Sequence, residues 1–356
     1  MAKKAAFSDT FPRVGKNPST SGSGGPGEAG ETCDALDRLV WVDGGFRPWA
    51  DATIHVLSHS LQRGSLVFDY MSVHPVPSEE QAGDRTRSPG VAIFRLREHV
   101  ERFVQSCELM GLPLEQSNEE LAAAIIATVR ANPGARAVKI SAYFASIEID
   151  IVPIDTRVTV AIAAYDPKTD ITDRLPRPSP PRPNLLKLWI EKERANRRED
   201  IVSPQAKVSA NYASPMTAKQ RARAEGYDEI VLVDEDGNLA EGPTSNLFIV
   251  NAAGELLTPA SEKVLHGVTR SSIIELAKAE GIPFREAKVK PEDLWSASEA
   301  FLTGTTAGVW SVESVDGREI GSTCPGPISS LLRDRFSRVS NGEDPDFEHW
   351  LTRVED

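Results

Sequence analysis

The chain has 356 residues and a mass of 38.7 kDa, and its 40 basic and 52 acidic side chains give a formal net charge of −12. With 40% hydrophobic and 26% charged residues, it has the composition of a globular protein with an ample core. The negative charge argues against nucleic acid or an anionic membrane as the main partner, because both require a cationic surface. No apolar run approaches the roughly 20 residues needed to span a bilayer.

The three cysteines, Cys33, Cys107 and Cys324, are odd in number and far apart in the sequence. This pattern fits neither a disulfide framework nor a zinc site, so we expect no bound metal. Because free thiols are typical of a reducing compartment, we expect a cytoplasmic protein.

Composition divides the chain into five parts. Residues 1–35 are rich in Gly, Ser and Pro and are predicted to form a flexible tail. A proline-rich stretch from Pro176 to Pro183 forbids helix and regular strand, and predicts an interdomain loop over residues 171–184. We therefore expect an N-terminal α/β domain over 36–170, a second domain over 185–340 and a C-terminal tail over 341–356.

In the first domain, residues 53–57 and 67–73 read as short strands. The apolar spacing predicts a helix over 97–110 that ends at Gly111. Ser117 and Glu120 form a capping-box pattern that predicts a second helix. Strands are expected again at 138–144 and 158–165.

The second domain is predicted to begin with a strand at 185–190, followed by a helix from Ser214 to Gly226. Strands at 229–233 and 246–250 flank a turn, and Thr269 is expected to cap a helix that ends at Gly281. Because both halves mix antiparallel-looking strands with helices, the predicted fold class is α+β, a mixed α/β architecture.

Four motifs in the second domain carry chemistry. A lysine among small uncharged residues, Lys207, would be desolvated and therefore nucleophilic at neutral pH. An acid, Glu241, lies between a turn and an apolar strand. The stretches 265–270 and 301–308 place Gly and Thr where a helix begins and where a strand ends, and both suit a phosphate. Taken singly, each motif also has an ordinary structural explanation: a surface lysine, a turn carboxylate, an N-cap and a turn.

The order and spacing of the four motifs favour the chemical explanation over the ordinary structural one. From about residue 41 to 336, the chain resembles the class IV aminotransferases, pyridoxal-phosphate enzymes of fold type IV. The resemblance rests on 206-AKVSANY-212, on Glu241-Gly242 through 246-NLF-248, on 265-LHGVTR-270, on 304-GTTA-307 and on 93-IFRLREH-99. It implies a two-domain fold, pyridoxal 5'-phosphate as cofactor, and a homodimer or higher homo-oligomer.

The resemblance also implies roles for individual residues. Lys207 would bind the cofactor as an imine and move the proton at the substrate α-carbon, and Glu241 would keep the pyridine nitrogen protonated. Tyr212 would hydrogen-bond the phenolic oxygen, and Arg95 would bind the phosphate. The phosphate site would be completed by Gly267, Val268, Thr269 and Thr305.

The overall motif set looks most like the branched-chain enzymes, which implies a small apolar amino acid as donor and a 2-oxo acid such as 2-oxoglutarate as acceptor. The residues expected near the substrate are Arg63, Phe68, Tyr70, Lys139, Thr306 and Ala307. Three positions depart from the pattern of those enzymes. Arg63 replaces the usual tyrosine, and Asp69-Tyr70 replaces the usual Glu-Gly. The usual Tyr-x-Arg becomes Val138-Lys139-Ile140, so the arginine near the substrate carboxylate is missing unless Lys139 substitutes for it.

These departures leave alternatives open. An arginine at position 63 is reminiscent of (R)-amine transaminases, so an enzyme for D-amino acids or (R)-amines is the second hypothesis. Aminodeoxychorismate lyase shares the fold, although nothing in the sequence favours it. A catalytically silent relative that binds a ligand or a partner protein is the hypothesis from a different class, and the presence of both Lys207 and Glu241 argues against it.

Overall fold

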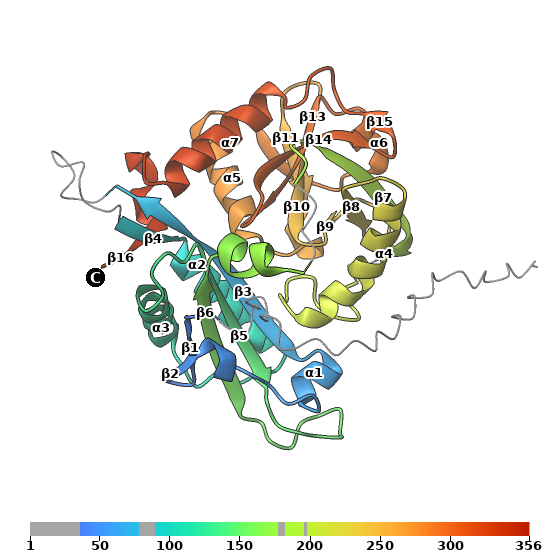
Figure 1. Cartoon of the computed structure of the whole chain (residues 1–356). Helices are drawn as coiled ribbons and strands as arrows, with labels where there is room; N and C mark the ends of the chain where they lie inside the picture. The colour runs from blue at the N-terminus through green and yellow to red at the C-terminus, as the bar shows by residue number, and fades with distance from the viewer. Residues whose placement is uncertain (1–35, 78–89, 177–181, 196–197, 356) are drawn as a thin grey trace, which may run out of the picture.

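The computed structural model describes residues 36–77, 90–176, 182–195 and 198–355. It contains two β-sheets, one built mainly from the first half of the chain and one from the second half (Figure 1). Helices accompany both sheets, which confirms the mixed α/β class predicted from the sequence. Within the described ranges, no helix is both long enough and apolar enough to cross a membrane.

The first sheet has seven antiparallel strands in the order β16-β4-β3-β5-β6-β1-β2. Their bounds are β1 Leu39–Val42, β2 Gly45–Pro48, β3 Leu66–Val76, β4 Gly90–Phe94, β5 Ala137–Phe144, β6 Val158–Tyr165 and β16 Leu351–Val354. Burial alternates along β3, because successive side chains of a strand point to opposite faces. Val67, Asp69 and Met71 are buried on one face, whereas Phe68 and Tyr70 are half-buried on the other.

Two helices, α2 (Leu96–Leu109) and α3 (Asn118–Arg130), pack on the fully buried face of this sheet, and a short helix, α1 (His59–Arg63), precedes β3. The predicted capping box begins α3: the Glu120 N–H donates to Ser117 Oγ at 3.2 Å, and the Ser117 N–H donates to Glu120 Oε2 at 2.8 Å. Both helices therefore begin within a few residues of the positions that the sequence indicated.

The second sheet has nine strands, with the main order β12-β11-β10-β13-β14-β7-β8; β9 pairs with β10 and β15 with β14. Strand β7 runs parallel to both β8 and β14, and β11 runs parallel to β12. The strand bounds are β7 Leu186–Ala195, β8 Glu229–Val233, β9 Glu241–Gly242, β10 Ser245–Val250, β11 Leu256–Pro259, β12 Phe284–Ala287, β13 Glu299–Gly304, β14 Gly308–Val315 and β15 Arg318–Glu319.

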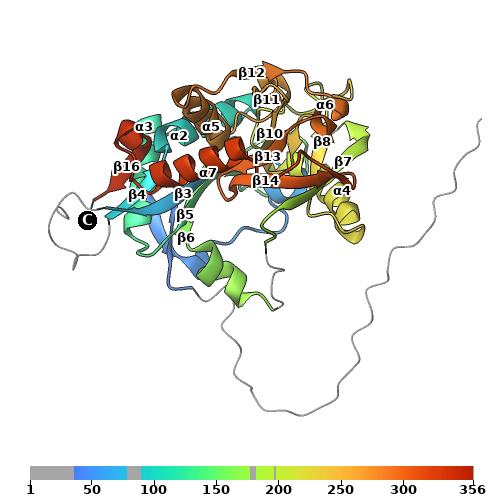
Figure 2. The same cartoon turned by 90° about the horizontal axis from the view of Figure 1, so that it is seen from above.

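The helices that accompany this sheet are α4 Ala213–Ala224, α5 Val268–Ala279, α6 Pro291–Trp295 and α7 Pro327–Ser340. The view in Figure 2 shows α7 lying alongside β13 and β14. Short helical turns are η1 Trp49–Asp51, η3 Pro167–Ile171, η4 Thr172–Arg174, η5 Ser209–Tyr212, η6 Ser261–Lys263 and η7 Pro345–Trp350.

The two sheets are joined by contacts between residues of the two halves of the chain. Val208, from the segment before η5, forms a β-bridge with Val67 of β3 and is buried in the core of the first sheet. A second contact joins Phe94 of β4 to Phe336 of α7, with ring centroids 5.3 Å apart. Residues of the second half of the chain therefore help to build the first core.

Three local predictions differ from the structure. Residues 53–57, predicted as a strand, form an irregular segment that ends in a turn before α1. Helix α5 has Gly267 and not Thr269 as its N-cap. Residues 341–355 are not a tail, because they form η7 and then β16, which pairs with β4 of the first sheet. The predicted N-terminal tail over 1–35 and residues 177–181 of the proline-rich loop lie outside the described residues.

Candidate active site

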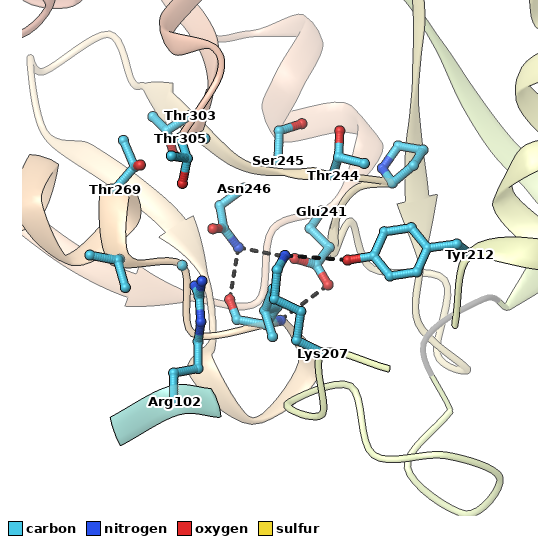
Figure 3. A pocket seen from close by; sticks show the side chains of 15 residues that line it. Arg102, Lys207, Tyr212, Glu241, Thr244, Ser245, Asn246, Thr269, Thr303 and Thr305 are labelled. Carbon is cyan, nitrogen blue, oxygen red and sulfur yellow. Dashed lines mark hydrogen bonds between the residues drawn. The ribbon is translucent and has the colours of Figure 1, made fainter. Parts of the chain in front are cut away.

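A pocket lies where the two sheets meet, and it collects most of the residues that the sequence motifs singled out (Figure 3). Its lining comes from α2, from the segment around η5, from β9 and β10, from the start of α5 and from the end of β13. The residues that line it are Arg102, Lys207, Tyr212, Glu241, Pro243, Thr244, Ser245, Asn246, Leu265, Gly267, Val268, Thr269, Thr303, Gly304 and Thr305.

Lys207 is held by its backbone. Its carbonyl oxygen accepts a 3.0 Å hydrogen bond from the N–H of Phe68 on β3, and its own N–H donates to Ser106 Oγ of α2 at 3.1 Å. The side chain is thereby directed into the pocket, where its Nζ lies 3.4 Å from Tyr212 Oη. The same Nζ lies 5.1 Å from the centroid of the Phe68 ring, so an aromatic wall borders the amine.

Glu241 is only 2% exposed, and two neighbours fix its carboxylate. Asn246 Nδ2 donates to Oε2 at 3.0 Å, and the Leu265 N–H donates to Oε1 at 3.1 Å. The register of β9 with β10 places Glu241 directly opposite Asn246, which explains why the motif carries both residues. Figure 3 shows the carboxylate and the Lys207 amine in the same pocket.

The opposite end of the pocket is suited to an anion. Among the described residues, no side chain caps α5, so the first N–H groups of the helix, at Val268 and Thr269, are available to a ligand beside the Thr305 side chain. Thr303 Oγ1 is buried and has no hydrogen-bond partner in the part of the chain that the structure describes. The sequence did not single out Thr303, which lies near the end of β13 and two residues before Thr305 in the following turn.

Gly267 allows the loop before α5 to approach β10. A Cβ atom at position 267 would lie 2.0 Å from Asn246 Oδ1, although the backbone φ of −64° would be acceptable for any residue. Close approach, and not backbone conformation, therefore explains the glycine.

The arginine of the pocket is Arg102, and not Arg95 as the sequence predicted. Arg95 is the N-cap of α2, and its guanidinium donates to Glu98 at 2.7 Å and to Glu275 at 2.8 Å while it stacks 4.2 Å from the Trp350 ring centroid. Arg102 lies two helical turns further along α2 and extends into the pocket (Figure 3).

Two buried polar groups accompany Arg102. Asp69 of β3 is fully buried and accepts hydrogen bonds from Arg102 and from His99 Nδ1. Burial alone would raise the pKa of Asp69, but Arg102 and His99 lower it well below the usual range of an aspartate. Burial lowers the pKa of His99, and Arg102 and Lys207 lower it further, whereas Asp69 opposes the shift.

Of the predicted substrate residues, Phe68, Tyr70 and Lys139 lie together. Lys139 of β5 is the register partner of Tyr70, and its Nζ lies 4.5 Å from the Phe68 ring centroid. Burial lowers the pKa of Lys139, and the nearby Lys207 lowers it further. Burial also raises the pKa of Tyr70. Phe68 and Lys139 lie near Lys207, although none of these three residues lines the pocket itself.

Thr306 and Ala307 form the turn after β13, where the Ala307 N–H donates to the Gly304 carbonyl at 2.9 Å. This turn adjoins the anion end of the pocket. Arg63 lies apart from these groups: it is exposed at the end of α1 and donates to the Ile149 carbonyl oxygen at 2.9 Å. Within one chain, the structure therefore does not bring Arg63 to Lys207.

Comparison with known proteins identifies the family that the chain resembles. The family model described as amino-transferase class IV matches residues 84–315. The branched-chain-amino-acid aminotransferase of Pseudomonas aeruginosa is 30% identical over 89% of this chain and 98% of its own, and that of Escherichia coli K12 is 31% identical over 88% and 97%.

Solved structures give the same result. The branched-chain amino acid aminotransferase of Thermoproteus uzoniensis with norvaline has a TM-score of 0.76 and 30% identity, and covers 89% of this chain and 99% of its own. A branched-chain amino acid aminotransferase from T.th., solved with pyridoxamine 5'-phosphate, has a TM-score of 0.78 and 32% identity at the same coverage. The chain belongs to the class IV aminotransferases.

Proposed function

We propose that this enzyme uses pyridoxal 5'-phosphate to move the amino group of a small apolar amino acid of the branched-chain type to a 2-oxo acid such as 2-oxoglutarate. The observation that carries this conclusion is the convergence of the Lys207 amine, the fixed Glu241 carboxylate and the start of α5 on one pocket. The relatives named as branched-chain enzymes support the donor class.

The residues present fit the cofactor. A pyridine ring needs an acid at its nitrogen, a phosphate needs N–H and hydroxyl donors, and an aldehyde needs an amine, and this pocket offers Glu241, the start of α5 and Lys207 in that order. The buried Thr303 Oγ1, which no described residue satisfies, adds a donor for a ligand. We infer that Lys207, Tyr212, Glu241, Val268, Thr269 and Thr305, together with Arg102, hold the cofactor.

When bound, pyridoxal phosphate supplies an electron sink for the bonding electrons of the substrate α-carbon. The chain supplies the rest. The Lys207 amine removes and returns the proton at that carbon, and its backbone bonds to Phe68 and Ser106 keep it in position. Glu241, fixed by Asn246 and Leu265, holds a proton on the ring nitrogen. The rings of Phe68 and Tyr212, with centroids 5.4 Å apart, lie beside the amine and give it an aromatic surrounding.

We propose Phe68, Tyr70 and Lys139 as the residues that border the substrate. The aromatic rings offer an apolar surface to a branched side chain. Lys139, whose pKa is lowered by burial, offers a cation to a substrate carboxylate on the same face of the sheet. Thr306 and Ala307 would border the substrate from the side of the β13 turn.

We also propose a homodimer. Large exposed apolar side chains lie on two neighbouring segments, here called the α1 surface: Val56, Leu57 and Leu61 on one, and Ile147, Ile149, Ile151, Val152 and Ile154 on the other. Ile149 is 94% exposed and Ile154 is 88% exposed, which is unusual for so many large apolar side chains in one place. A second copy of the chain would bury this surface and would place Arg63 at the interface between the two subunits.

Sedimentation of the wild-type protein and of an Ile149→Asp variant tests the dimer. We expect the variant to shift toward monomer, whereas Ile201→Asp, at a residue 69% exposed elsewhere, should sediment like the wild type. A wild-type monomer, or an Ile149→Asp variant that remains fully dimeric, would contradict the assignment of this surface.

The function is tested by the visible spectrum of the purified protein with L-leucine, D-alanine or (R)-1-phenylethylamine. We expect the absorbance band of the bound cofactor to be bleached by L-leucine alone. Bleaching by D-alanine or the amine, with L-leucine inert, would replace the donor class by D-amino acids or (R)-amines. The Lys207→Ala variant should lose turnover and the borohydride-reducible attachment of the cofactor, and retention of both would disprove the role of Lys207.

A further inference from the structure

The pocket arginine is tied to two parts of the molecule. Its Nε and Nη2 donate to the two carboxylate oxygens of Asp69 at 2.8 and 2.7 Å, in the bidentate geometry that fixes the plane of a guanidinium. Its Nη1 donates at 3.1 Å to the carbonyl oxygen of His266, the residue before the N-cap of α5. Arg102 therefore connects β3 of the first sheet with the loop that begins the anion end of the pocket.

Asp69 has no exposed surface, so its charge is not hydrated by solvent. A carboxylate in such a position is stable only with cationic and hydrogen-bonding partners, and Arg102 and His99 supply them. The converse also holds: without the carboxylate, the largely buried Arg102 side chain would lose both of its fixed contacts on the β3 side. The side chain would then be free to leave the pocket toward solvent.

We propose that Asp69 is a positioning residue for the phosphate group of the cofactor and acts by holding the Arg102 guanidinium in the pocket. This proposal rests on the proposed function and deepens it. Asp69 does not line the pocket and so does not contact the phosphate. Its effect reaches the ligand only through Arg102, with the Nη1 bond to His266 setting the position of the guanidinium relative to α5.

The test compares two ligands of the apoprotein, pyridoxal phosphate and pyridoxal, which differ only in the phosphate. For Asp69→Asn we expect the dissociation constant of pyridoxal phosphate to rise at least about tenfold, as when a partner that orients a ligand-binding side chain is removed. The dissociation constant of pyridoxal should change by less than about twofold, because the Lys207 end of the pocket is untouched. A purely structural role would weaken both ligands alike.

A matched control is the Arg38–Asp170 ion pair, which is 2.9 Å long with side chains 12% and 11% exposed, and neither residue lines the pocket. Asp170→Asn should lower the stability of the protein without changing the ratio of the two dissociation constants. Asp69→Glu keeps the charge and should retain most of the preference for pyridoxal phosphate over pyridoxal.

Should Asp69→Asn fail to fold, removing both charges avoids an unpaired buried arginine. Asp69→Asn/Arg102→Gln should bind pyridoxal phosphate as Arg102→Gln alone does, since Asp69 acts through Arg102. The proposal is overturned by an unchanged ratio in Asp69→Asn, or by a double variant that binds pyridoxal phosphate markedly more weakly than Arg102→Gln. A wild-type apoprotein that binds neither ligand would overturn the cofactor assignment and this proposal with it.

Discussion

The hydroxyl of Ser106, in the last turns of α2, accepts the backbone N–H of Lys207 at 3.1 Å and donates to the carbonyl oxygen of Arg102 at 2.8 Å. One helix of the first sheet therefore positions both the reactive amine and the pocket arginine, although Lys207 follows 101 residues after Ser106 in the chain. The site is built across the two halves of the molecule, and its geometry depends on how they pack.

Ser106→Ala should therefore affect catalysis as well as folding. We expect the free energy of unfolding to fall by about 1–2 kcal/mol, because the Lys207 N–H loses its partner. Turnover should fall about tenfold as the amine becomes less well placed. Thr128→Val provides the control, since Thr128 is equally buried and bonds to Ala124 far from the pocket. It should lose stability but keep turnover, and an equal loss of turnover in both variants would contradict the role of Ser106.

Substitutions of Arg102 and of Arg95, the N-cap of α2, should have different effects. Arg102→Met should raise the dissociation constant of pyridoxal phosphate at least about tenfold, because a charge-assisted donor to the phosphate is lost. Arg95→Met should leave this constant unchanged and lower stability by about 1–2 kcal/mol, since its ion pairs are with partly exposed carboxylates. Titration of the apoproteins and denaturant unfolding measure the two effects. Weaker cofactor binding in Arg95→Met would restore the sequence-based assignment.

Glu241→Gln should reduce turnover by more than about a hundredfold while most of the cofactor stays bound, because the amide keeps the shape of the side chain but does not hold the ring nitrogen protonated. Glu299→Gln is the matched control: Glu299 is also buried and accepts two backbone N–H groups, those of Ile328 and Ser329. That variant should lose stability alone. Equal turnover in Glu241→Gln and the wild type would remove the role of Glu241.

Two glycine substitutions should differ sharply. Gly267→Ala places a Cβ against Asn246 Oδ1 and should displace the side chain that fixes Glu241, so both cofactor affinity and turnover should fall. Gly45→Ala adds a Cβ with nothing within 4 Å and should leave cofactor affinity unchanged. Spectroscopic titration of both apoproteins gives the comparison. A Gly267→Ala variant with wild-type affinity would show that the loop before α5 can shift without consequence.

The lowered pKa of His99 predicts a pH dependence of stability. The unfolded chain takes up a proton at His99 near pH 6.5, whereas the folded protein, with Asp69, Arg102 and Lys207 around the ring, takes it up only at lower pH. Stability should therefore fall as the pH is lowered below about 6.5, with a contribution from His99 of at most about 1.4 kcal/mol per pH unit. Unfolding in guanidinium chloride between pH 5 and 8 measures how the free energy of unfolding changes with pH. This change should be smaller in His99→Gln than in the wild type. An equal change in both proteins would show that His99 is not its cause.

The sequence predicted the kind of chemistry in the pocket better than it predicted the full set of residues that form the pocket. Lys207, Tyr212, Glu241 and Thr305 lie in one pocket because short local motifs carry each of them. The family motif indicates Arg95 and the sequence did not single out Arg102, because only packing decides whether the N-cap of α2 or a residue two turns further along reaches the pocket. Asp69 was noted only as a departure from the family pattern, since its partners are 30 and 33 residues away.

Helices and strands with local sequence signals were predicted, whereas elements that depend on distant partners were not. The helices α2 and α3 were predicted because caps and apolar spacing are local signals. Strand β16 was taken for a tail because its four residues are stabilised by β4, which lies in the first third of the chain. Residues 53–57 have the composition of a strand but no neighbouring strand among the described residues to pair with, and composition alone does not supply one.

The pairing of β16 with β4 also governs how the protein is made. Because residues 351–354 are synthesised after every other described strand of the first sheet, that sheet keeps an open edge at β4 until they emerge from the ribosome. Until then β4, and not β16, is the edge strand on this side of the sheet. A chain released before residue 351 would carry all of the pocket residues, and one edge of β4 would lack its partner strand.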